Sequence, residues 1–244
     1  MKISVCLSVY NGEQYLKQQL DSILIQVKST DEIIIINDNS SDASIKIIKN
    51  YNDPRIRLYS NEQNIGVIES FEKAIEKATG DIIFLCDQDD VWLDNKVDTV
   101  INIFETKGCT LVSSDAYIVD QSLKIISDSF YKHRKSGNGV IKNIYKNTFL
   151  GCTLAFRKEI KNFILPFPKG IPMHDAWIGI LNSMLSKTVF IDDKLIYYRR
   201  HDKNVTGLYP SDNLLKILKS RGVLVTLLLI RYTKVRLKYF RKFD

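Results

Sequence analysis

The first half of the chain alternates between short apolar runs rich in β-branched residues and amphipathic segments with helical spacing. Continuous apolar runs are typical of strands buried on both faces of a parallel sheet. Parallel strands need crossover helices between them, so the pattern predicts an α/β fold with a mostly parallel central sheet flanked by helices. Strands are expected at 2–9, 32–36, 55–60, 81–86 and 110–114, and helices at 13–26, 43–51, 67–78 and 95–106.

The second half is less regular, and no internal repeat interrupts it. Residues 120–147 are polar and contain two glycines, which predicts a mobile loop. A strand is expected at 152–156, a helix at 175–185, and two extended pieces at 189–191 and 195–200. The chain therefore predicts one α/β body with a C-terminal tail.

Polar residues gather where three of the predicted strands end. They occupy positions 8–11, 37–38 and 87–90. Ligands of open parallel sheets bind beyond the carboxyl ends of the strands, so we expect these clusters to line one crevice.

The third cluster places Asp87, Asp89 and Asp90 within four residues. Such closely spaced carboxylates raise one another's pKa unless a cation lies among them, and Asp-x-Asp suits Mg²⁺ or Mn²⁺. The alternative is that Asp90 or Asp94 only favours the start of the next helix. No Gly-rich phosphate loop of the P-loop or dinucleotide type occurs, which argues against a P-loop enzyme or an ordinary dehydrogenase.

The net charge of +7 resides in the tail. Nine of the 35 Lys and Arg residues and one of the 28 Asp and Glu residues lie in 213–244, which leaves 26 basic and 27 acidic residues before them. A nearly neutral body argues against nucleic acid as a partner. The tail reads as a basic amphipathic helix, and its apolar stretch at 222–230 is too short to span a bilayer. Residues 213–243 could bind an anionic membrane surface, or pack on the body or a second subunit.

Cellular location is inferred from the cysteines and the N-terminus. Cys6, Cys86, Cys109 and Cys152 form no CxxC pair, which predicts reduced, buried thiols. The first apolar run is too short for a signal peptide or a span. We expect a cytoplasmic body, with a peripheral position on the inner face of the membrane if the tail binds lipid.

Four stretches taken together resemble the family 2 glycosyltransferases of the GT-A fold. They occur in the family's order over about residues 1–207, and they read SVYNGEQYL, IIIINDNSSD, NEQNIGVIESFEKAIEKATGDIIFLCDQDDVW and YRRHDKNVTG. The resemblance implies a metal-dependent inverting hexosyltransferase that uses a nucleotide-diphosphate sugar. The DQDDVW and HDAW variants are similar to bacterial enzymes of surface polysaccharide synthesis, rhamnosyltransferase-like members among them.

The resemblance also implies roles for single residues. Asp38 would meet the base, which leaves uracil or thymine open, Asp87 would hold the ribose, and Asp89 would bind Mn²⁺ or Mg²⁺ beside the diphosphate. His201 matches a histidine that closes over the phosphates or the metal. The nucleotide-sugar site would comprise Ser8, Tyr10, Glu13, Asp38, Asn64, Gly66, Asp87 and Asp89.

On the acceptor side, Asp175 matches the catalytic base, with a helix N-cap as the alternative. Many relatives have Glu-Asp where this chain has His174 and Asp175, so no catalytic role is assigned to His174. Trp177 could stack on an acceptor sugar, although an aromatic on such a helix is more often a core residue. Arg199, Arg200 and Lys203 could pair with phosphate or be solvated.

The expected organisation is a GT-A domain at 1–210, divided into a nucleotide-binding half at about 1–115 and an acceptor half at about 116–210, and a basic helical tail at 211–244. The acceptor would be a saccharide or a lipid-linked saccharide. A sugar nucleotidylyltransferase is a distant alternative, because SVYNGEQYL lacks the Gly-rich basic loop that holds a triphosphate. A non-catalytic nucleotide-sugar-binding scaffold is the third hypothesis, and an oligomer formed through the tail is left open.

Overall fold

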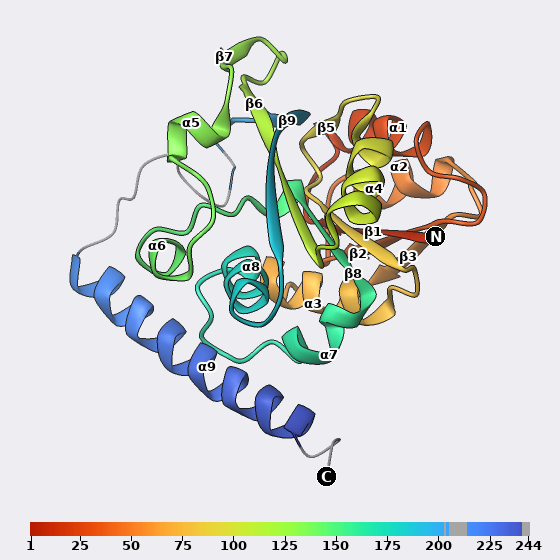
Figure 1. Cartoon of the computed structure of the whole chain (residues 1–244). Coiled ribbons are helices and arrows are strands. Elements are labelled where there is room, and N and C mark those ends of the chain that lie inside the picture. Colours follow the sequence, from red (N-terminus) through yellow and green to blue (C-terminus); the bar gives the residue numbers. More distant parts are fainter. Residues whose placement is uncertain (203, 205–213, 241–244) are drawn as a thin grey trace.

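The computed structural model describes residues 1–202, 204 and 214–240. They form one nine-stranded sheet in the order β3-β2-β1-β4-β8-β6-β9-β5, with β7 paired to β6 (Figure 1). The strands are β1 Ile3–Val9, β2 Glu32–Asn37, β3 Ile56–Ser60, β4 Ile82–Cys86, β5 Val91–Trp92, β6 Leu111–Val119, β7 Ile125–Ser127, β8 Leu154–Arg157 and β9 Thr188–Arg199. The α-helices are α1 Leu16–Leu24, α2 Ser44–Asn50, α3 Val67–Lys77, α4 Lys96–Lys107, α5 Phe130–Arg134, α6 Val140–Tyr145, α7 Lys161–Ile164, α8 His174–Leu185 and α9 Leu214–Phe240.

The first four strands confirm the predicted parallel arrangement. β1 pairs in parallel with β2 and β4, and β2 pairs in parallel with β3. Every residue of β2 and β4 is buried, as the continuous apolar runs indicated. The carboxyl ends of β1, β2 and β4 consequently meet at one edge of the sheet.

The second half makes the sheet mixed. β8 is antiparallel to β4 and β6, whereas β6 and β9 run parallel. The two extended pieces expected near 189–200 are one strand, β9, with a register shift opposite Asp115. Exposed Asp192 and Asp193 lie where the register shifts, so these acidic residues mark an irregularity within β9 and not its end.

Residues 120–147 are not the mobile loop that we expected, since β7, α5 and α6 lie within them. Buried polar side chains order this segment in place of an apolar repeat. Asp115 accepts hydrogen bonds from the Tyr131 backbone N–H (2.9 Å) and the Ser129 hydroxyl (2.5 Å). Asn143 of α6 accepts hydrogen bonds from the backbone N–H and the hydroxyl of Thr148 (3.0 and 2.7 Å). Hydrophobic periodicity carries no signal for such contacts.

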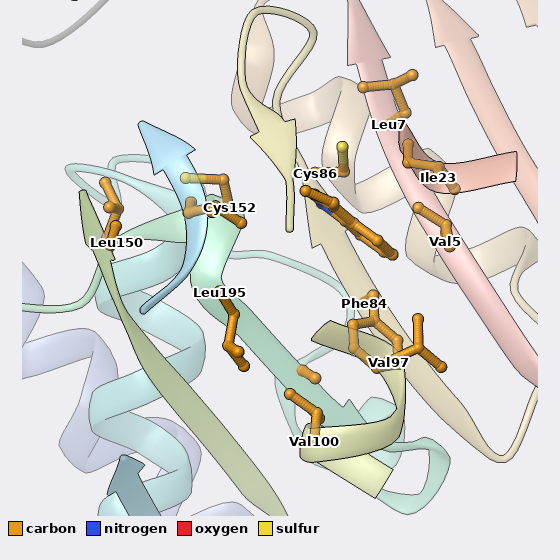
Figure 2. Packing of buried hydrophobic residues seen from close by; sticks show 14 of the residues in the cluster. Val5, Leu7, Ile23, Phe84, Cys86, Val97, Val100, Leu150, Cys152 and Leu195 are labelled. Carbon is orange, nitrogen blue, oxygen red and sulfur yellow. The ribbon is translucent and has the colours of Figure 1, made fainter. Parts of the chain in front are cut away.

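Two hydrophobic cores cover the two faces of the sheet. One contains side chains of α1, α2 and α4, and Figure 2 shows part of it, with Phe84 and Val97 packed beside β1. The other contains side chains of α3, α7, α8 and α9. The helices therefore flank the sheet on both sides.

The C-terminal helix α9 lies against α8 and α6 (Figure 1). Among the helices described, none has an apolar stretch long enough to cross a bilayer. The four cysteines are buried and unpaired, which confirms the expectation for the thiols.

Two helical glycines provide a matched test of the packing. A Cβ at Gly179 of α8 would lie 2.5 Å from the ring of Phe149, whereas a Cβ at Gly222 of α9 would meet no atom within 4 Å. Gly179→Ala is expected to lower the free energy of unfolding by about 1–3 kcal/mol through overpacking. Gly222→Ala should leave it unchanged or raise it by up to about 1 kcal/mol. Urea unfolding measures both, and an equal stabilisation by the two substitutions would contradict the packing described.

Candidate functional site

A cavity of about 480 Å³ opens at the carboxyl ends of β1, β2 and β4. Its opposite wall comes from residues 150–151 and the start of α8. Most of the side chains predicted for the site line it, although they come from segments far apart in the sequence. These are Ser8, Tyr10, Asp38, Asn64, Gly66, Asp87, Asp89 and Asp175.

Asp38 connects the end of β2 to the turn that precedes α3. Its carboxylate accepts hydrogen bonds from the Asn61 side-chain amide and the Ile65 backbone N–H, both at 2.9 Å, and from the Gly66 backbone N–H at 2.8 Å. Gly66 has a φ of 90°, a conformation that favours glycine. Asp38 therefore both lines the cavity and shapes the turn that carries Asn64.

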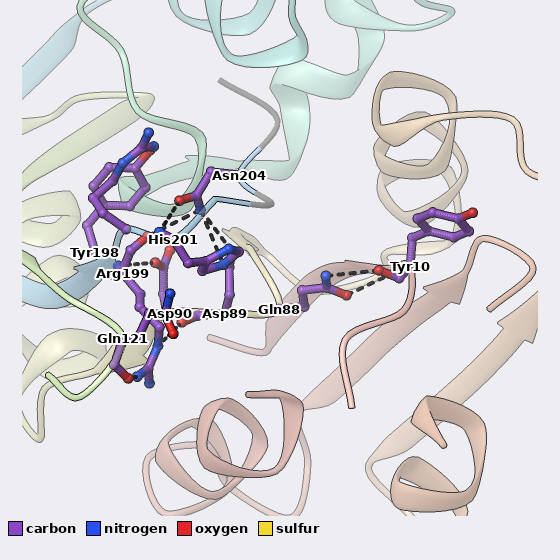
Figure 3. A network of polar contacts seen from close by, with 10 residues as sticks. Tyr10, Gln88, Asp89, Asp90, Gln121, Tyr198, Arg199, His201 and Asn204 are labelled. Carbon is purple, nitrogen blue, oxygen red and sulfur yellow. Dashed lines mark hydrogen bonds and ion pairs between the residues drawn. The ribbon is translucent and has the colours of Figure 1, made fainter. Parts of the chain in front are cut away.

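Asp89 is held by two residues that follow β9 (Figure 3). Its Oδ2 atom lies 2.8 Å from Nε2 of His201 and accepts a hydrogen bond from the Asn204 side-chain amide at 3.1 Å. The His201 ring also stacks on Tyr15, with 5.0 Å between ring centroids. The predicted partners Asp89 and His201 are thus in direct contact.

Arg199 is buried, so the alternative that it is solvated was wrong, and its pairing with phosphate stays a prediction. It is 2 % exposed, and its guanidinium donates to the Asp89 carbonyl (2.7 Å), the Gln18 side chain (2.6 Å) and the Gln121 carbonyl. Its backbone N–H donates to Asp90 (3.0 Å). Figure 3 shows Arg199 joining the acidic turn to β9. Arg200 donates to the Tyr198 hydroxyl, and Lys203 lies outside the described residues.

The other two acids of the turn, Asp87 and Asp90, form a cluster with Cys152. One oxygen each of Asp87 and Asp90 and the Cys152 Sγ lie within 4.8 Å of one another. Burial and the negative charges of Asp89 and Asp175 raise the pKa of Asp87 to about 7, and burial raises that of Asp90. Oδ2 of Asp90 is buried without a hydrogen-bond partner among the described residues. Burial and neighbouring acids therefore disfavour the charged forms of Asp87 and Asp90, and the described neighbours do not offset this effect.

Lys96 provides a positive charge close to this cluster. It is fully buried, and its Nζ donates to the Cys152 carbonyl at 3.2 Å and lies 5.0 Å from the Trp92 ring centroid. Burial lowers its pKa to about 8, while Asp90 raises it.

Asp175 lies in the first turn of α8, on the wall opposite the acidic turn. Its Oδ1 accepts hydrogen bonds from the Ala176 backbone N–H (2.5 Å) and the Asn147 side-chain amide (3.1 Å). Burial raises its pKa to about 6. This carboxylate can accept a proton near neutral pH and also stabilises the start of α8.

His174 lines the same wall, and sequence reasoning gave it no role. It is 4 % exposed and stacks on Phe71, and burial lowers its pKa to about 3, so the ring is neutral. Neither ring nitrogen has a hydrogen-bond partner among the described residues. A Cβ at Gly151 would lie 2.8 Å from Nε2, so this glycine makes room for the imidazole. The sequence signal that could have pointed to His174 is that it stands where many relatives have the glutamate of a Glu-Asp pair.

Gln88 is a second residue that the sequence did not single out. Its side-chain amide accepts from the Tyr10 backbone N–H (2.9 Å) and donates to the Tyr10 carbonyl (3.1 Å). Figure 3 shows this two-bond contact between the ends of β1 and β4. A Cβ at Gly12 would lie 2.4 Å from the Gln88 amide oxygen, which explains the glycine. A glutamine between two aspartates carries no sequence signal for such a contact.

Three predicted site residues are not among those that line the cavity, and His201, the first of them, reaches the site through its contact with Asp89. Glu13 is not among the cavity residues, and its carboxylate accepts a hydrogen bond from the Ala43 backbone N–H (2.9 Å) before α2. The expectation that Trp177 stacks on an acceptor sugar is wrong for this structure. Trp177 is fully buried, its indole N–H donates to the Ile164 carbonyl (2.9 Å), and Arg231 lies over its ring. It is a core residue, the alternative that its helical position favoured.

Comparisons with known proteins agree with this geometry. The family model described as glycosyl transferase family 2 matches residues 4–163. An uncharacterised glycosyltransferase of Nostoc sp. is 28 % identical over 215 residues, which cover 84 % of this chain and 66 % of that protein. The Escherichia coli UDP-Glc:alpha-D-GlcNAc-diphosphoundecaprenol beta-1,3-glucosyltransferase WfgD is 26 % identical over 181 residues, or 73 % of this chain and 69 % of WfgD.

Among solved structures, S. aureus TarS 1–349 in complex with UDP-GlcNAc superimposes with a TM-score of 0.71 at 18 % identity, over 92 % of this chain and 66 % of that one. This likeness shows the fold. The chain spans between about a third and two thirds of the length of the first curated relatives that it matches. The family match and the shared architecture establish that this chain is a GT-A-fold member of glycosyltransferase family 2.

Proposed function

We propose that the protein transfers a sugar from a UDP- or dTDP-linked donor to a saccharide or lipid-linked saccharide, with inversion, in the synthesis of a bacterial surface polysaccharide. The observation that carries this proposal is one cavity with the acidic strand-end turn on one wall and Asp175 on the other. The reaction catalysed by WfgD, as its name states it, supports a lipid-linked acceptor. A rhamnosyltransferase-like specificity remains a proposal from the DQDDVW and HDAW motifs.

Asp175 acts as the base in this proposal. Its carboxylate takes the proton of the acceptor hydroxyl while that oxygen attacks C1 of the donor sugar. The bond between C1 and the diphosphate oxygen breaks, and the nucleoside diphosphate departs from the opposite face with the bonding electrons. The hydrogen bond from Asn147 holds the carboxylate at the cavity wall. Burial raises the pKa of this base to about 6, and a pKa near the working pH favours proton transfer.

The residues at the end of β4 fit a divalent cation. Asp89 offers a carboxylate oxygen and His201 an imidazole nitrogen, a pair that suits Mn²⁺ better than Mg²⁺. Oδ2 of Asp90 in the same turn has no hydrogen-bond partner among the described residues. A cation bound here would neutralise charge on the departing diphosphate.

The donor side of the cavity is assigned to the nucleotide. Ser8 of β1, Tyr10 directly after β1, Asp38 after β2 and Asn64 of the turn before α3 would line the base and ribose. Asp38 can accept about one further hydrogen bond, from a base N–H, because a carboxylate accepts about four and three already come from Asn61, Ile65 and Gly66. Uracil and thymine present the same N3–H, which is why both donors are proposed.

Replacement of the base gives the first test of this function. Asp175→Asn should lower kcat by about 10²–10⁴-fold, because the amide cannot accept the acceptor's proton, while the donor's Kd changes little. Transfer is measured as release of nucleoside diphosphate in the presence of acceptor, and donor binding by calorimetry. Transfer at the wild-type rate by the purified variant would refute the assignment of Asp175.

The raised pKa of Asp175 predicts a pH dependence. The carboxyl group is protonated below its pKa of about 6, so the rate at saturating substrate should fall about tenfold per pH unit below that value and level off above it. Donor binding measured in the same buffers separates this effect from loss of the substrate. A residual rate of Asp175→Asn that follows the same pH curve would contradict the prediction.

Substitutions of Asp89 and Asp94 provide a matched test of metal binding. Asp94 is an exposed acid of the same segment that does not line the cavity. Asp89→Asn should abolish the Mn²⁺-dependent rise in melting temperature that UDP or dTDP produces, whereas Asp94→Asn should retain it. Equal Mn²⁺-dependent stabilisation of both variants by nucleotide would exclude Asp89 as a ligand of the metal.

A separate assay tests the alternative enzyme class. Release of pyrophosphate from a nucleoside triphosphate and a sugar 1-phosphate would indicate a nucleotidylyltransferase and not a glycosyltransferase.

A further inference from the structure

We propose that the surface formed by α6 and α9 docks the protein on an anionic lipid bilayer. The α6–α9 face is defined here by Ile141 and Tyr145 of α6 and by Ile230, Lys234, Arg236 and Leu237 of α9. Its binding to lipid requires no donor, acceptor or metal, so it goes beyond the proposed transfer reaction and can be tested without it.

The first observation is the orientation of α9. Leu224, Leu228 and Val235 are buried against the body, and Arg231, on the same stripe, donates to the Phe163 and Leu165 carbonyls (2.8 Å each). At 100° per residue these positions lie on one side of the helix. The α9 members of the face lie on the remaining circumference of the helix, so the contact with the body does not bury them.

The outward side of α9 combines apolar and basic residues. Ile230 is 61 % exposed and Leu237 is 57 % exposed, and the exposed side chains of Lys234 and Arg236 lie on either side of this apolar pair around the helix. Apolar residues interleaved with cations are the composition of helices that lie in a membrane interface. A helix facing only water would carry few of these apolar side chains.

The second observation is that α6 lies beside α9 (Figure 1) and also exposes apolar and basic side chains. Ile141 and Tyr145 lie one turn apart and are 83 % and 82 % exposed. Exposed Lys142 and Lys146 follow each of them directly. Two helices that are far apart in sequence but in contact thus each expose apolar side chains beside basic ones.

The third observation is the distribution of charge. No Asp or Glu occurs between Asp128 and Glu159, and none occurs within α9. The residues before position 213 carry 26 basic and 27 acidic side chains in all, so positive charge is concentrated on the segments that form this face. An anionic bilayer complements that charge. A two-fold contact with a second copy would bring these cations against themselves, so lipid is the favoured occupant.

The position of the face agrees with a membrane-bound substrate. Asn143 of α6 holds Thr148, and the neighbouring Asn147 donates to Asp175. Docking through α6 would therefore place the acceptor wall of the cavity near the bilayer. This last point alone rests on the proposed function.

Sedimentation with vesicles tests the proposal on the whole chain. The protein should bind vesicles of phosphatidylcholine with about a third phosphatidylglycerol, and bind phosphatidylcholine alone at least about tenfold more weakly. Lys234→Glu/Arg236→Glu and Ile141→Ser/Tyr145→Ser should each weaken binding to the anionic vesicles by about tenfold or more.

Matched controls lie on the other side of the molecule. Lys46→Glu/Lys49→Glu reverses two exposed charges of α2, and Ile25→Ser removes an apolar side chain that is 72 % exposed. Both controls should bind like the parent protein, and circular dichroism verifies that every variant is folded. Transfer to an acceptor without a lipid should be unchanged in the α6 and α9 variants, which separates this test from that of the proposed function.

Three outcomes would overturn the proposal. They are equal binding to neutral and anionic vesicles, unchanged binding when either the α6 or the α9 residues are replaced, and a dimer in sedimentation velocity that these replacements dissociate.

Discussion

The acidic turn after β4 depends on two buried cations that come from different parts of the chain. Arg199 reaches the turn from β9, where it binds the Asp89 carbonyl through its guanidinium and Asp90 through its backbone N–H. Lys96 reaches the adjacent cluster from α4, through the Cys152 carbonyl. Carboxylates packed this closely would otherwise repel one another in a medium that screens charge poorly. Through these contacts the mixed half of the sheet fixes the geometry of a site that begins in the parallel half.

This dependence explains which features the sequence could predict. Unbroken apolar runs predict the strands near 2–9, 32–36 and 81–86. The topology of parallel sheets then brings the polar ends of these strands together. Asp38, Asp87 and Asp89 could be placed at one cavity on that basis. The ordered motifs supplied Asp175, which no periodicity would have connected with them.

Other features could not be predicted, because they depend on contacts between distant residues. The burial of Arg199 requires the register of β9, which an exposed acidic pair obscures. The order within 120–147 comes from buried polar groups such as Asp115, and these look like loop residues in a sequence. Trp177 and His174 lie on one helix, yet contacts with Ile164 and Arg231 bury the tryptophan, whereas the histidine lines the cavity beside Gly151.

Asp38 has a consequence for how nucleotide preference can change in such a protein. Its carboxylate satisfies the backbone N–H groups of Ile65 and Gly66, so the residue proposed to read the base also supports the local chain path. A side chain without an acceptor oxygen at this position leaves two amide hydrogens unpaired, which costs stability. Divergence toward a different base through such a change at position 38 is therefore expected to need a compensating substitution near the start of α3.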